Sequence, residues 1–352
     1  MIIAIIAIAV ILILISEYTL SRGLLPYVVY KSSVEKALYE PGEVIEIVSE
    51  ISNYNKVRVP FVRIREWLTV EADLLEGAND AYTGSLWHAV EKTFSIKAKE
   101  KLIKRAYFSL SKRGRYSFGE YEISVGDVFG FRESTAMGTI PHEILIMPER
   151  AKERKLQEIV QGFIGDISVR RFIMEDPILI MGFNDYTGHE PMRDISWIRT
   201  AVANKLQVKK YDYTTDINVT VMLNCDGEGD EDLEECYRIT RMVVEELEKA
   251  RIPYAFRTNG MLFGPTGRIE YVPKGLGETH LKEILFGLAT AHMTRVYSFD
   301  SLVSKVIKER KQSENYFLIT RKLDAKAEEA FKRLQQTCDG RIGVITAGEE
   351  TL

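Results

Sequence analysis

The hydrophobic pattern of this chain changes near its middle. From residue 27 to about residue 147, apolar and polar residues alternate, as at Ile45, Glu46 and Ile47. A period of two residues places one face of a strand on a core and the other face in water. After about Asp216 the pattern becomes a short apolar run followed by an amphipathic segment, and this unit repeats. A chain of 352 residues is too long for one ordinary hydrophobic core. Because its two halves have different hydrophobic patterns, we expect two domains of different architecture.

Clusters of turn-forming residues divide the alternating half. They stand at 40–42, 52–55, 76–80 and 112–115. This spacing leaves room for roughly six to eight strands, which favours a small antiparallel β-sandwich. We assign the β-sandwich domain to residues 26–150.

The second half alternates strands with helices. Residues 217–225 form a nearly continuous apolar run, which is typical of a strand buried on both faces of a parallel sheet. Further strands are expected at 252–258, 316–320 and 342–346, with helices at 231–251, 280–292, 301–310 and 325–337. This order predicts a doubly wound α/β domain over residues 216–352. The fold class is thus α+β and multidomain, and residues 151–215 form a connecting segment.

The N-terminus carries an unbroken run of 14 Ile, Ala, Val and Leu residues at 2–15. As a helix this run is ~21 Å long, short of the ~30 Å hydrocarbon core, and extension to Leu20 brings it near spanning length. We predict a transmembrane helix within residues 1–25. A cleaved signal peptide is one alternative, but no Lys or Arg precedes the run and no small-x-small site follows it. A buried strand or helix is the other alternative.

Charge and cysteine content indicate in which cellular compartment the chain lies. Arg22, Lys31 and Lys36 follow the apolar run, so the positive-inside rule predicts a single-pass protein of the cell membrane with its C-terminal domains in the cytoplasm. Three cysteines without C-x-x-C spacing agree with a reducing compartment and support neither a disulfide framework nor a zinc site. A net charge of -4 argues against nucleic acid as a partner.

Lysine and arginine recur through residues 97–115. We interpret them as the solvated edge of a strand, where lysines discourage pairing with another chain. Contact with anionic lipid is the alternative, because a membrane anchor would hold this domain near a bilayer.

A dense motif lies in the connecting segment. Its members are Tyr186, Gly188, Glu190, Arg193, Ile195 and Trp197. We interpret this motif as architecture: Arg193 pairs with Glu190 or Asp194, and Trp197 fills the joint between the two domains. A helix is expected over 194–204, with Ile195, Ile198 and Val202 on its inward stripe. A binding surface built on the same residues is the alternative.

The spacing of this motif resembles Tyr-x-x-Gly-Asp-x-x-Arg-x-Ile-x-Trp, a signature of the bacterial family named domain of unknown function 58. Segments 113–116 and 126–131 look like the family's Arg-Gly and Asp-x-Phe-Gly motifs, and Asn259-Gly260 with 281–288 is a weaker match. The resemblance implies a C-terminal domain similar to a von Willebrand factor A domain and, as partner, a MoxR-type AAA+ ATPase. The sequence departs from the family where His189-Glu190 replaces Gly-Asp and where Asn184 replaces an arginine.

An acidic loop follows the first strand of the α/β half. Metal-binding A domains carry Asp-x-Ser-x-Ser after this strand. The loop of this chain has no hydroxyls but offers Asp226, Glu228 and Asp230, three carboxylates that could collect Mg²⁺ or Ca²⁺. We favour instead a cap of the following helix, whose N-terminus attracts negative charge. The strand end at Thr320-Arg321 also provides no matching acid.

These observations predict a membrane-anchored adaptor that has no catalytic residues and no resident cofactor. Its anchor contacts the lipid bilayer, and the resemblance makes a MoxR-type AAA+ ATPase its partner. The alternative is a divalent-metal-dependent ligand binder or hydrolase that uses the acidic loop Asp226–Asp230. A third reading, an envelope ligand binder, follows if the orientation in the membrane is reversed.

Overall fold

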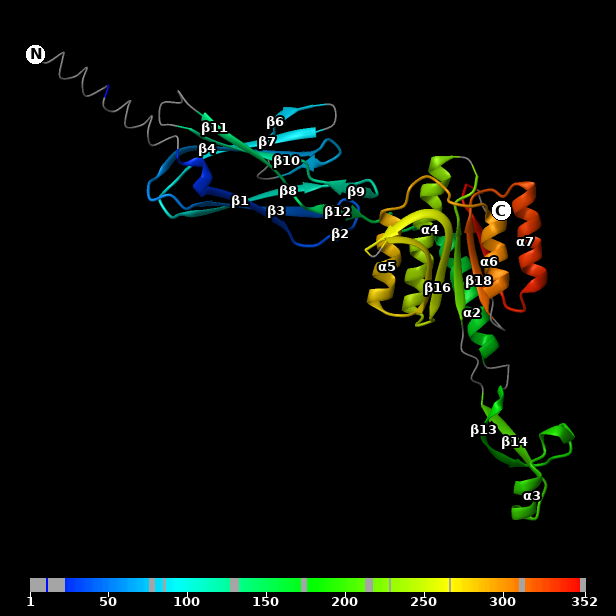
Figure 1. The fold of residues 1–352 in the computed structure, drawn as a ribbon. Helices are drawn as coiled ribbons and strands as arrows, with labels where there is room; N and C mark the ends of the chain where they lie inside the picture. Colours follow the sequence, from blue (N-terminus) through cyan, green and yellow to red (C-terminus); the bar gives the residue numbers. More distant parts are fainter. Residues whose placement is uncertain are drawn as a thin grey trace, which may run out of the picture. The chain divides into compact units, whose positions relative to one another are not determined.

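The structure is a computed structural model of the chain, and it describes residues 11, 23–75, 80–84, 87–126, 133–171, 176–212, 218–227, 229–265, 267–309 and 314–348. The chain divides into two compact units, Met1–Glu149 and Arg150–Leu352. Figure 1 shows their elements, and each unit is described by itself.

The predicted transmembrane helix is wrong for the part of the chain that the structure describes. Within those ranges, no helix is long and apolar enough to cross a membrane. Residues 2–15, on which the prediction rested, lie outside the described residues except for Ile11. The physical reason lies in length, since a spanning helix needs ~20 apolar residues and the run stops short of that. The expected single-pass membrane localisation fails with the helix.

The first unit consists of three β-sheets. Its elements are η1 (Leu25–Tyr27), β1 (Val28–Val34), β2 (Leu38–Tyr39), β3 (Val44–Asn53), β4 (Val59–Thr69), β5 (Asp73–Leu74), β6 (Asp80–Thr83), β7 (Trp87–Ile96), β8 (Lys101–Ser109), β9 (Gly114–Ser117), β10 (Glu120–Gly126), β11 (Glu133–Thr139) and β12 (Glu143–Ile146). One sheet has the order β1-β3-β8-β5, a second has β11-β10-β4-β7-β6, and a third has β2-β12-β9. The first two sheets are antiparallel throughout.

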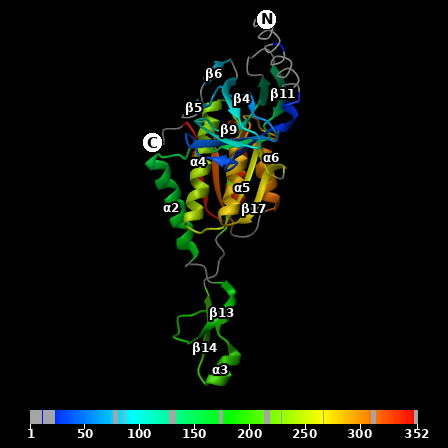
Figure 2. The same cartoon turned by 90° about the vertical axis from the view of Figure 1, so that its left-hand side faces the viewer.

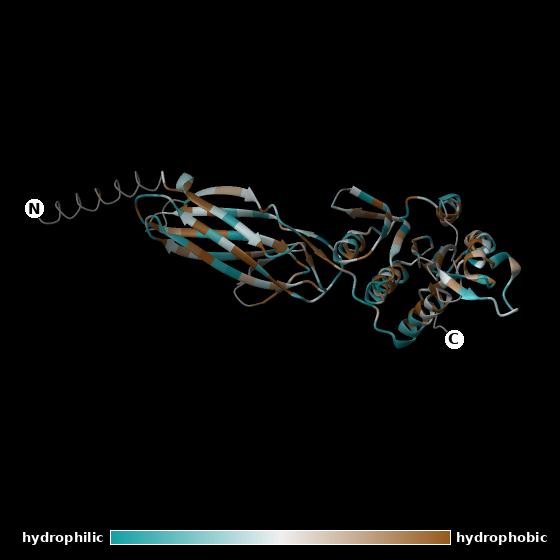
Figure 3. Ribbon diagram, turned by 90° about the horizontal axis from the view of Figure 1, so that it is seen from below, coloured by the Kyte–Doolittle hydropathy of each residue, from teal (hydrophilic) through white to brown (hydrophobic). Residues whose placement is uncertain are grey.

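Alternation along these strands builds the core of the first unit. Ile45, Ile47 and Ile51 of β3 are at most 4% exposed, while Glu46, Val48 and Glu50 between them are less buried. On β4 the same spacing buries Val62 and Ile64. Figure 3 shows hydrophobic and hydrophilic residues alternating along the strands. The buried side chains belong to one face of each sheet, as a period of two residues requires.

One carboxyl group lies inside the first unit. Glu66 of β4 is 5% exposed. The Tyr30 hydroxyl of β1 donates to Glu66 Oε1, and the Ser49 hydroxyl of β3 donates to the same oxygen at 2.6 Å. Burial, followed by the charge on Glu66, raises the pKa of Tyr30 above its usual value, so this hydroxyl keeps its proton and remains a donor. The Glu66 carboxyl therefore ties two strands of the first sheet to β4 of the second.

The basic residues expected at a strand edge meet acidic residues on neighbouring strands. Lys101 Nζ of β8 lies 2.5 Å from Glu50 Oε2 of β3. Arg105 Nε of β8 lies 3.0 Å from Glu46 Oε1 of β3. Cross-strand pairs of opposite charge favour the sheet itself. The alternation at these positions therefore follows from pairing within the sheet, and contact with anionic lipid gains no support from it.

The second unit contains a five-stranded sheet with helices on both faces. Its elements are α2 (Arg154–Arg171), β13 (Asp176–Asp185), η2 (Met192–Asp194), α3 (Trp197–Ala203), β14 (Gln207–Asp212), β15 (Val219–Asn224), α4 (Asp230–Lys249), β16 (Tyr254–Gly264), β17 (Gly267–Gly275), α5 (Glu278–Ala289), α6 (Phe299–Glu309), β18 (Asn315–Thr320), α7 (Ala325–Thr337) and β19 (Ile342–Thr346). The strand order is β17-β16-β15-β18-β19, in which β17 alone is antiparallel to its neighbour.

The helices of this sheet are sorted by face. Helices α4 and α5 contact each other on one face, and α6 and α7 contact each other on the other face (Figure 1). Figure 2 looks onto the face that carries α2, α4 and α5. The chain leaves β15 toward β16 on one side and later returns to β18 on the other side. The strand order therefore reverses beside β15, and ligand sites of doubly wound sheets lie at the carboxyl ends of the strands at such a point.

Candidate functional site

The motif residues of the connecting segment lie between two paired strands. β13 and β14 form an antiparallel pair in which Asp185 stands opposite Gln207, and η2 and α3 lie in the connection between them. Ile195 forms an isolated bridge with Val208, and both side chains are at most 6% exposed. We call residues 186–206 the signature segment. Its backbone is held in place by these bonds to the start of β14.

Glu190 stabilises the turn at the start of the signature segment. Its carboxylate accepts hydrogen bonds from the backbone N–H of Thr187 at 3.0 Å and from the Thr187 hydroxyl at 2.9 Å, and these bonds lower its pKa. Gly188 has a φ of 94°, a conformation that glycine adopts without strain. Of the two partners expected for Arg193, Asp194 is the one within reach, at 3.9 Å.

The apolar side chains of α3 face outward. Trp197 is 63% exposed, Ile198 is 81% exposed and Val202 is 76% exposed. The expected inward stripe is therefore wrong for Ile198 and Val202. The physical reason is that α3 has only seven residues and Ile195, which precedes it, supplies the buried contact. Two more exposed apolar side chains flank the helix, Met192 at 65% and Leu206 at 42%.

Asp226 lies at the carboxyl end of β15, where the strand order reverses. Its carboxylate accepts from Arg295 Nη1 at 2.8 Å and from the backbone N–H of Phe299 at 2.6 Å. Phe299 is the first residue of α6, so Asp226 caps α6 and not α4. The N-cap residue of α4 is Gly229, which makes no side-chain cap bond, so the expected cap of α4 is corrected for Asp226. Asp230 of the same loop does lie in the first turn of α4, where the helix dipole favours negative charge.

A buried guanidinium lies inside the loop that follows β15. Arg321 comes directly after β18 and is 5% exposed. Its Nε donates to the carbonyl of Asp226 at 3.1 Å, its Nη1 donates to the carbonyl of Gly229 at 2.9 Å, and its Nη2 donates to the carbonyl of Cys225. Three carbonyl oxygens thus converge on one internal cation.

Two glycines allow the loop to wrap around this guanidinium. Gly227 has a φ of 116° and Gly229 has a φ of 94°, values that other residues rarely adopt. A Cβ atom at Gly227 would lie 3.3 Å from Arg321 Nε. The close approach of Arg321 therefore explains Gly227, and the backbone conformation explains Gly229.

Polar side chains join the carboxyl ends of the three central strands. Asn224 Nδ2 of β15 donates to Thr320 Oγ1 of β18 at 2.9 Å, and Asn259 Nδ2 of β16 donates to Asn224 Oδ1 at 3.0 Å. The N–H of Cys225 donates to Asn259 Oδ1 at 2.7 Å. Asn224, Asn259 and Thr320 are at most 1% exposed, so each bond replaces one that water would otherwise make.

The residues at this edge do not fit a divalent cation. Both carboxylate oxygens of Asp226 already accept hydrogen bonds, and Arg321 brings a positive charge into the loop. Asp230 is exposed on α4, and Glu228 lies outside the described residues. Among the residues that the structure describes, no group of three His, Cys, Asp or Glu side chains can hold a metal ion. A cation here would be repelled by Arg321 and Arg295.

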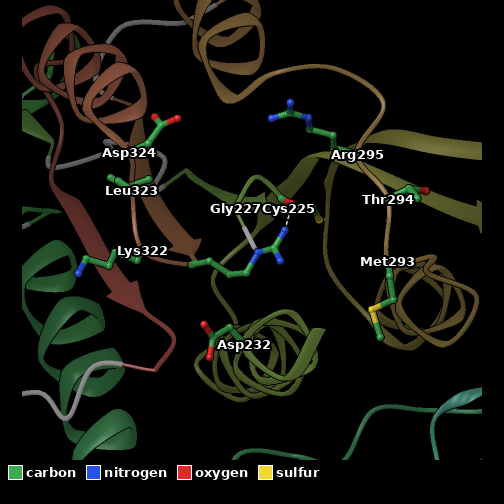
Figure 4. Close-up of a pocket in the computed structure, with 10 residues that line it drawn as sticks. Cys225, Gly227, Asp232, Met293, Thr294, Arg295, Lys322, Leu323 and Asp324 are labelled. Carbon is green, nitrogen blue, oxygen red and sulfur yellow. Dashed lines mark hydrogen bonds between the residues drawn. The ribbon is translucent and has the colours of Figure 1, made fainter. Parts of the chain in front are cut away.

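A cavity of about 920 Å³ opens above this edge (Figure 4). Its lining includes Thr294, Arg295, Arg321, Lys322 and Asp324. Asp324 accepts from the N–H of Ala327 at 2.7 Å and so caps α7. The charged groups with a defined role here therefore hold the loops and helix ends of the sheet.

Sequence reasoning missed the two residues that organise this edge. Arg321 attracted notice only because it is not an acid, and Asn224 was not singled out. Asn224 is a polar residue at the end of a continuous apolar strand. Its position predicts a buried hydrogen-bond network, since buried polar groups need partners. Asn259 was part of the weakest family match, yet it makes two bonds in the network.

The buried cysteines of the second unit are predicted to be unreactive in the folded protein. Cys225 is 2% exposed and burial raises its pKa to about 11, while Cys236 is fully buried and burial raises its pKa further. Because the thiolate is the reactive form, we expect Ellman's reagent at pH 8 to modify Cys338 at least about a hundredfold faster than the other two. All three thiols should react in urea. Two or more fast thiols in the native protein would contradict the packing around β15.

No family model matches this chain, and no curated protein matches it either. Among solved structures, it is similar to the CARDB domain of a Pyrococcus furiosus protein in complex with di-metal ions, at 13% identity over 34% of this chain and 91% of that chain, with a TM-score of 0.22. It is also similar to a non-cellulosomal cohesin from Archaeoglobus fulgidus, at 14% identity over 36% of this chain and 97% of that chain, with a TM-score of 0.24. TM-scores this low carry no inference about function.

Proposed function

We propose that this chain is a non-enzymatic adaptor of the kind its motifs resemble, domain of unknown function 58, and that it binds a MoxR-type AAA+ ATPase through the signature segment. The observation that carries the proposal is the exposure of Trp197, Ile198 and Val202 on α3. Their backbone is fixed by the bridge between Ile195 and Val208, so the side chains are presented from a defined scaffold.

Exposed apolar side chains of this size favour a protein partner. Trp is among the residues that contribute most to binding when a partner covers them, and clustered apolar groups on a surface mark interaction sites. Ile198 and Val202 are four residues apart and so lie on the same face of α3. The spacing matches recognition of a short helix in a groove.

The carboxyl edge of the sheet supports an adaptor more than an enzyme. Asp226, a metal ligand in the alternative reading of the acidic loop, caps α6 and pairs with Arg295. Asn224, Asn259 and Thr320 bond to one another or to the backbone. Groups committed to such bonds hold the fold, and no observation at this edge favours the alternative of a metal-dependent hydrolase.

The Trp197→Ala variant tests this proposal. We expect it to bind a MoxR-type ATPase encoded in the same genome with a Kd roughly thirtyfold higher than that of the unchanged chain, or about 2 kcal/mol weaker. Surface plasmon resonance with the immobilised ATPase measures the loss. Trp87→Ala, which removes a 38% exposed tryptophan from β7, is the matched control and should bind normally. Unchanged affinity in Trp197→Ala would overturn the assignment of the binding surface.

A further inference from the structure

Three acidic side chains in or next to the signature segment, those of Asp185, Glu190 and Asp194, contact neighbouring side-chain or backbone groups. Glu190 accepts two hydrogen bonds from Thr187, and Asp185 accepts a hydrogen bond from Gln207 Nε2. Asp194 has 20% of its side chain exposed and lies 3.9 Å from Arg193. Negative charge in this part of the chain is therefore turned toward neighbouring groups.

The cationic side chains of the same segment face solvent. Arg193 has 85% of its side chain exposed, and Lys205 is exposed between α3 and β14. Arg199 is also exposed and stacks its guanidinium 5.0 Å from the centre of the Phe183 ring. Exposed cations thus precede, interrupt and follow the exposed apolar residues of α3.

We propose that the signature segment docks into an apolar groove of its partner whose border carries carboxylates. This inference deepens the proposed function and rests on it. The apolar side chains would enter the groove and supply most of the binding free energy. Arg193 and Lys205 would meet the carboxylates at the border, where charge pairs speed encounter and set orientation more than they add affinity.

Charge complementarity favours this groove over the other surfaces that could cover α3. A basic border would repel the cations, and a wholly apolar surface would remove them from water without a partner. A nucleic acid would offer phosphates but would leave Ile198 and Val202, which are 81% and 76% exposed, without apolar contacts. Nucleic-acid binding also calls for a basic domain, whereas the chain has a net charge of -4.

The first experiment uses the full chain and two synthetic amphipathic helical peptides that share one leucine stripe. One peptide carries glutamates beside the stripe and the other carries lysines. Isothermal titration calorimetry should detect binding of the glutamate peptide only, at least about tenfold weaker in 500 mM than in 50 mM salt. Equal binding of both peptides, binding of neither, or stronger binding of a single-stranded oligonucleotide would overturn the inference.

Charge-reversed variants assign the effect to the named residues. Arg193→Glu/Lys205→Glu should lose affinity for the glutamate peptide by at least about tenfold and gain affinity for the lysine peptide. The matched control is Lys326→Glu/Lys332→Glu, which makes the same charge change at two exposed positions of α7 and should behave as the unchanged chain. If the control loses as much affinity as the test variant, net charge and not this segment governs binding, and the inference fails.

The same variants separate this inference from the proposed function. An ATPase that binds the chain with an association rate insensitive to Arg193→Glu/Lys205→Glu contradicts the acidic border and leaves the adaptor role standing. Selective binding of the glutamate peptide without any binding of the ATPase supports the surface chemistry and contradicts the ATPase as partner.

Discussion

The Arg321→Met variant is expected to lower the thermal midpoint of the second unit by roughly 6–12 °C, which corresponds to about 3 kcal/mol or more in a domain of this size. The guanidinium donates to the carbonyls of Cys225, Asp226 and Gly229. Methionine fills much of the volume but donates no hydrogen bond. The carbonyls would be left without these donors at a site where Arg321 is 5% exposed. The loop between β15 and α4 would then lose the group that shapes it.

Differential scanning calorimetry of the full chain measures this effect. Arg333→Met is the matched control, because Arg333 forms an ion pair with Asp300 on the surface and has 48% of its side chain exposed. Such a pair contributes at most about 1 kcal/mol. A midpoint for Arg321→Met that equals that of the control would show that the carbonyls do not depend on the guanidinium.

Divalent cations provide a second readout at the same edge. If the Arg321 guanidinium supplies the positive charge of the loop, millimolar Mg²⁺ or EDTA should leave the midpoint of the unchanged protein within about 1 °C, since only a ligand that binds the folded state raises it. A rise of several degrees with Mg²⁺ would indicate a metal site at the acidic loop. That result would indicate that Asp226 binds the metal ion.

Strands and helices of the α/β sheet could be predicted where their hydrophobic pattern was continuous. β15 lies within the predicted range 217–225, and α4 begins and ends within two residues of the predicted range 231–251. β16 extends past the end predicted for its strand to Gly264, and its last residues form a hairpin with β17. The glycine-rich stretch 259–277 contains a signal for that hairpin, because glycine is typical of tight turns between paired strands.

The two surfaces of functional interest were harder to predict, for different reasons. On α3 the spacing of Ile198 and Val202 correctly indicates a shared helix face, but spacing does not say whether anything covers that face. At the carboxyl edge the bonds of Arg321 join residues almost a hundred positions apart in the sequence, such as Arg321 and Asp226. A contact of that range leaves no local pattern, so neither the helix cap favoured for the acidic loop nor its metal alternative included the arginine.

The alternation of β4 did contain a signal for the buried carboxylate of Glu66. The inward positions of this strand are Val62, Ile64, Glu66 and Leu68, so a carboxylate occupies a place that the period assigns to an apolar side chain. A break of this kind predicts buried donors nearby, because a buried carboxylate needs hydrogen-bond partners. Tyr30 and Ser49 are those donors.

Glu66→Leu is therefore expected to destabilise the first unit by about 3 kcal/mol. The change leaves the Tyr30 and Ser49 hydroxyls buried without their acceptor, at about 1–3 kcal/mol for each group. Glu66→Gln keeps an acceptor oxygen and should lose less. Urea denaturation followed by circular dichroism measures both losses. The control is Glu91→Leu on β7. Glu91 Oε2 lies 2.7 Å from Arg65 Nη2 in an ion pair whose side chains are 27% and 33% exposed, and its loss should stay within about 1 kcal/mol.

The triple variant Tyr30→Phe/Ser49→Ala/Glu66→Leu tests why Glu66→Leu loses stability. It shows whether the loss arises because the Tyr30 and Ser49 hydroxyls are buried without an acceptor. Removing all three polar groups leaves no buried hydroxyl without a partner, and replacing a whole buried polar group by apolar residues is often neutral. We expect the triple variant to recover most of the stability that Glu66→Leu loses. If it is instead less stable than Glu66→Leu by the sum of the single changes, the three residues act independently, and the carboxyl does not join the two sheets.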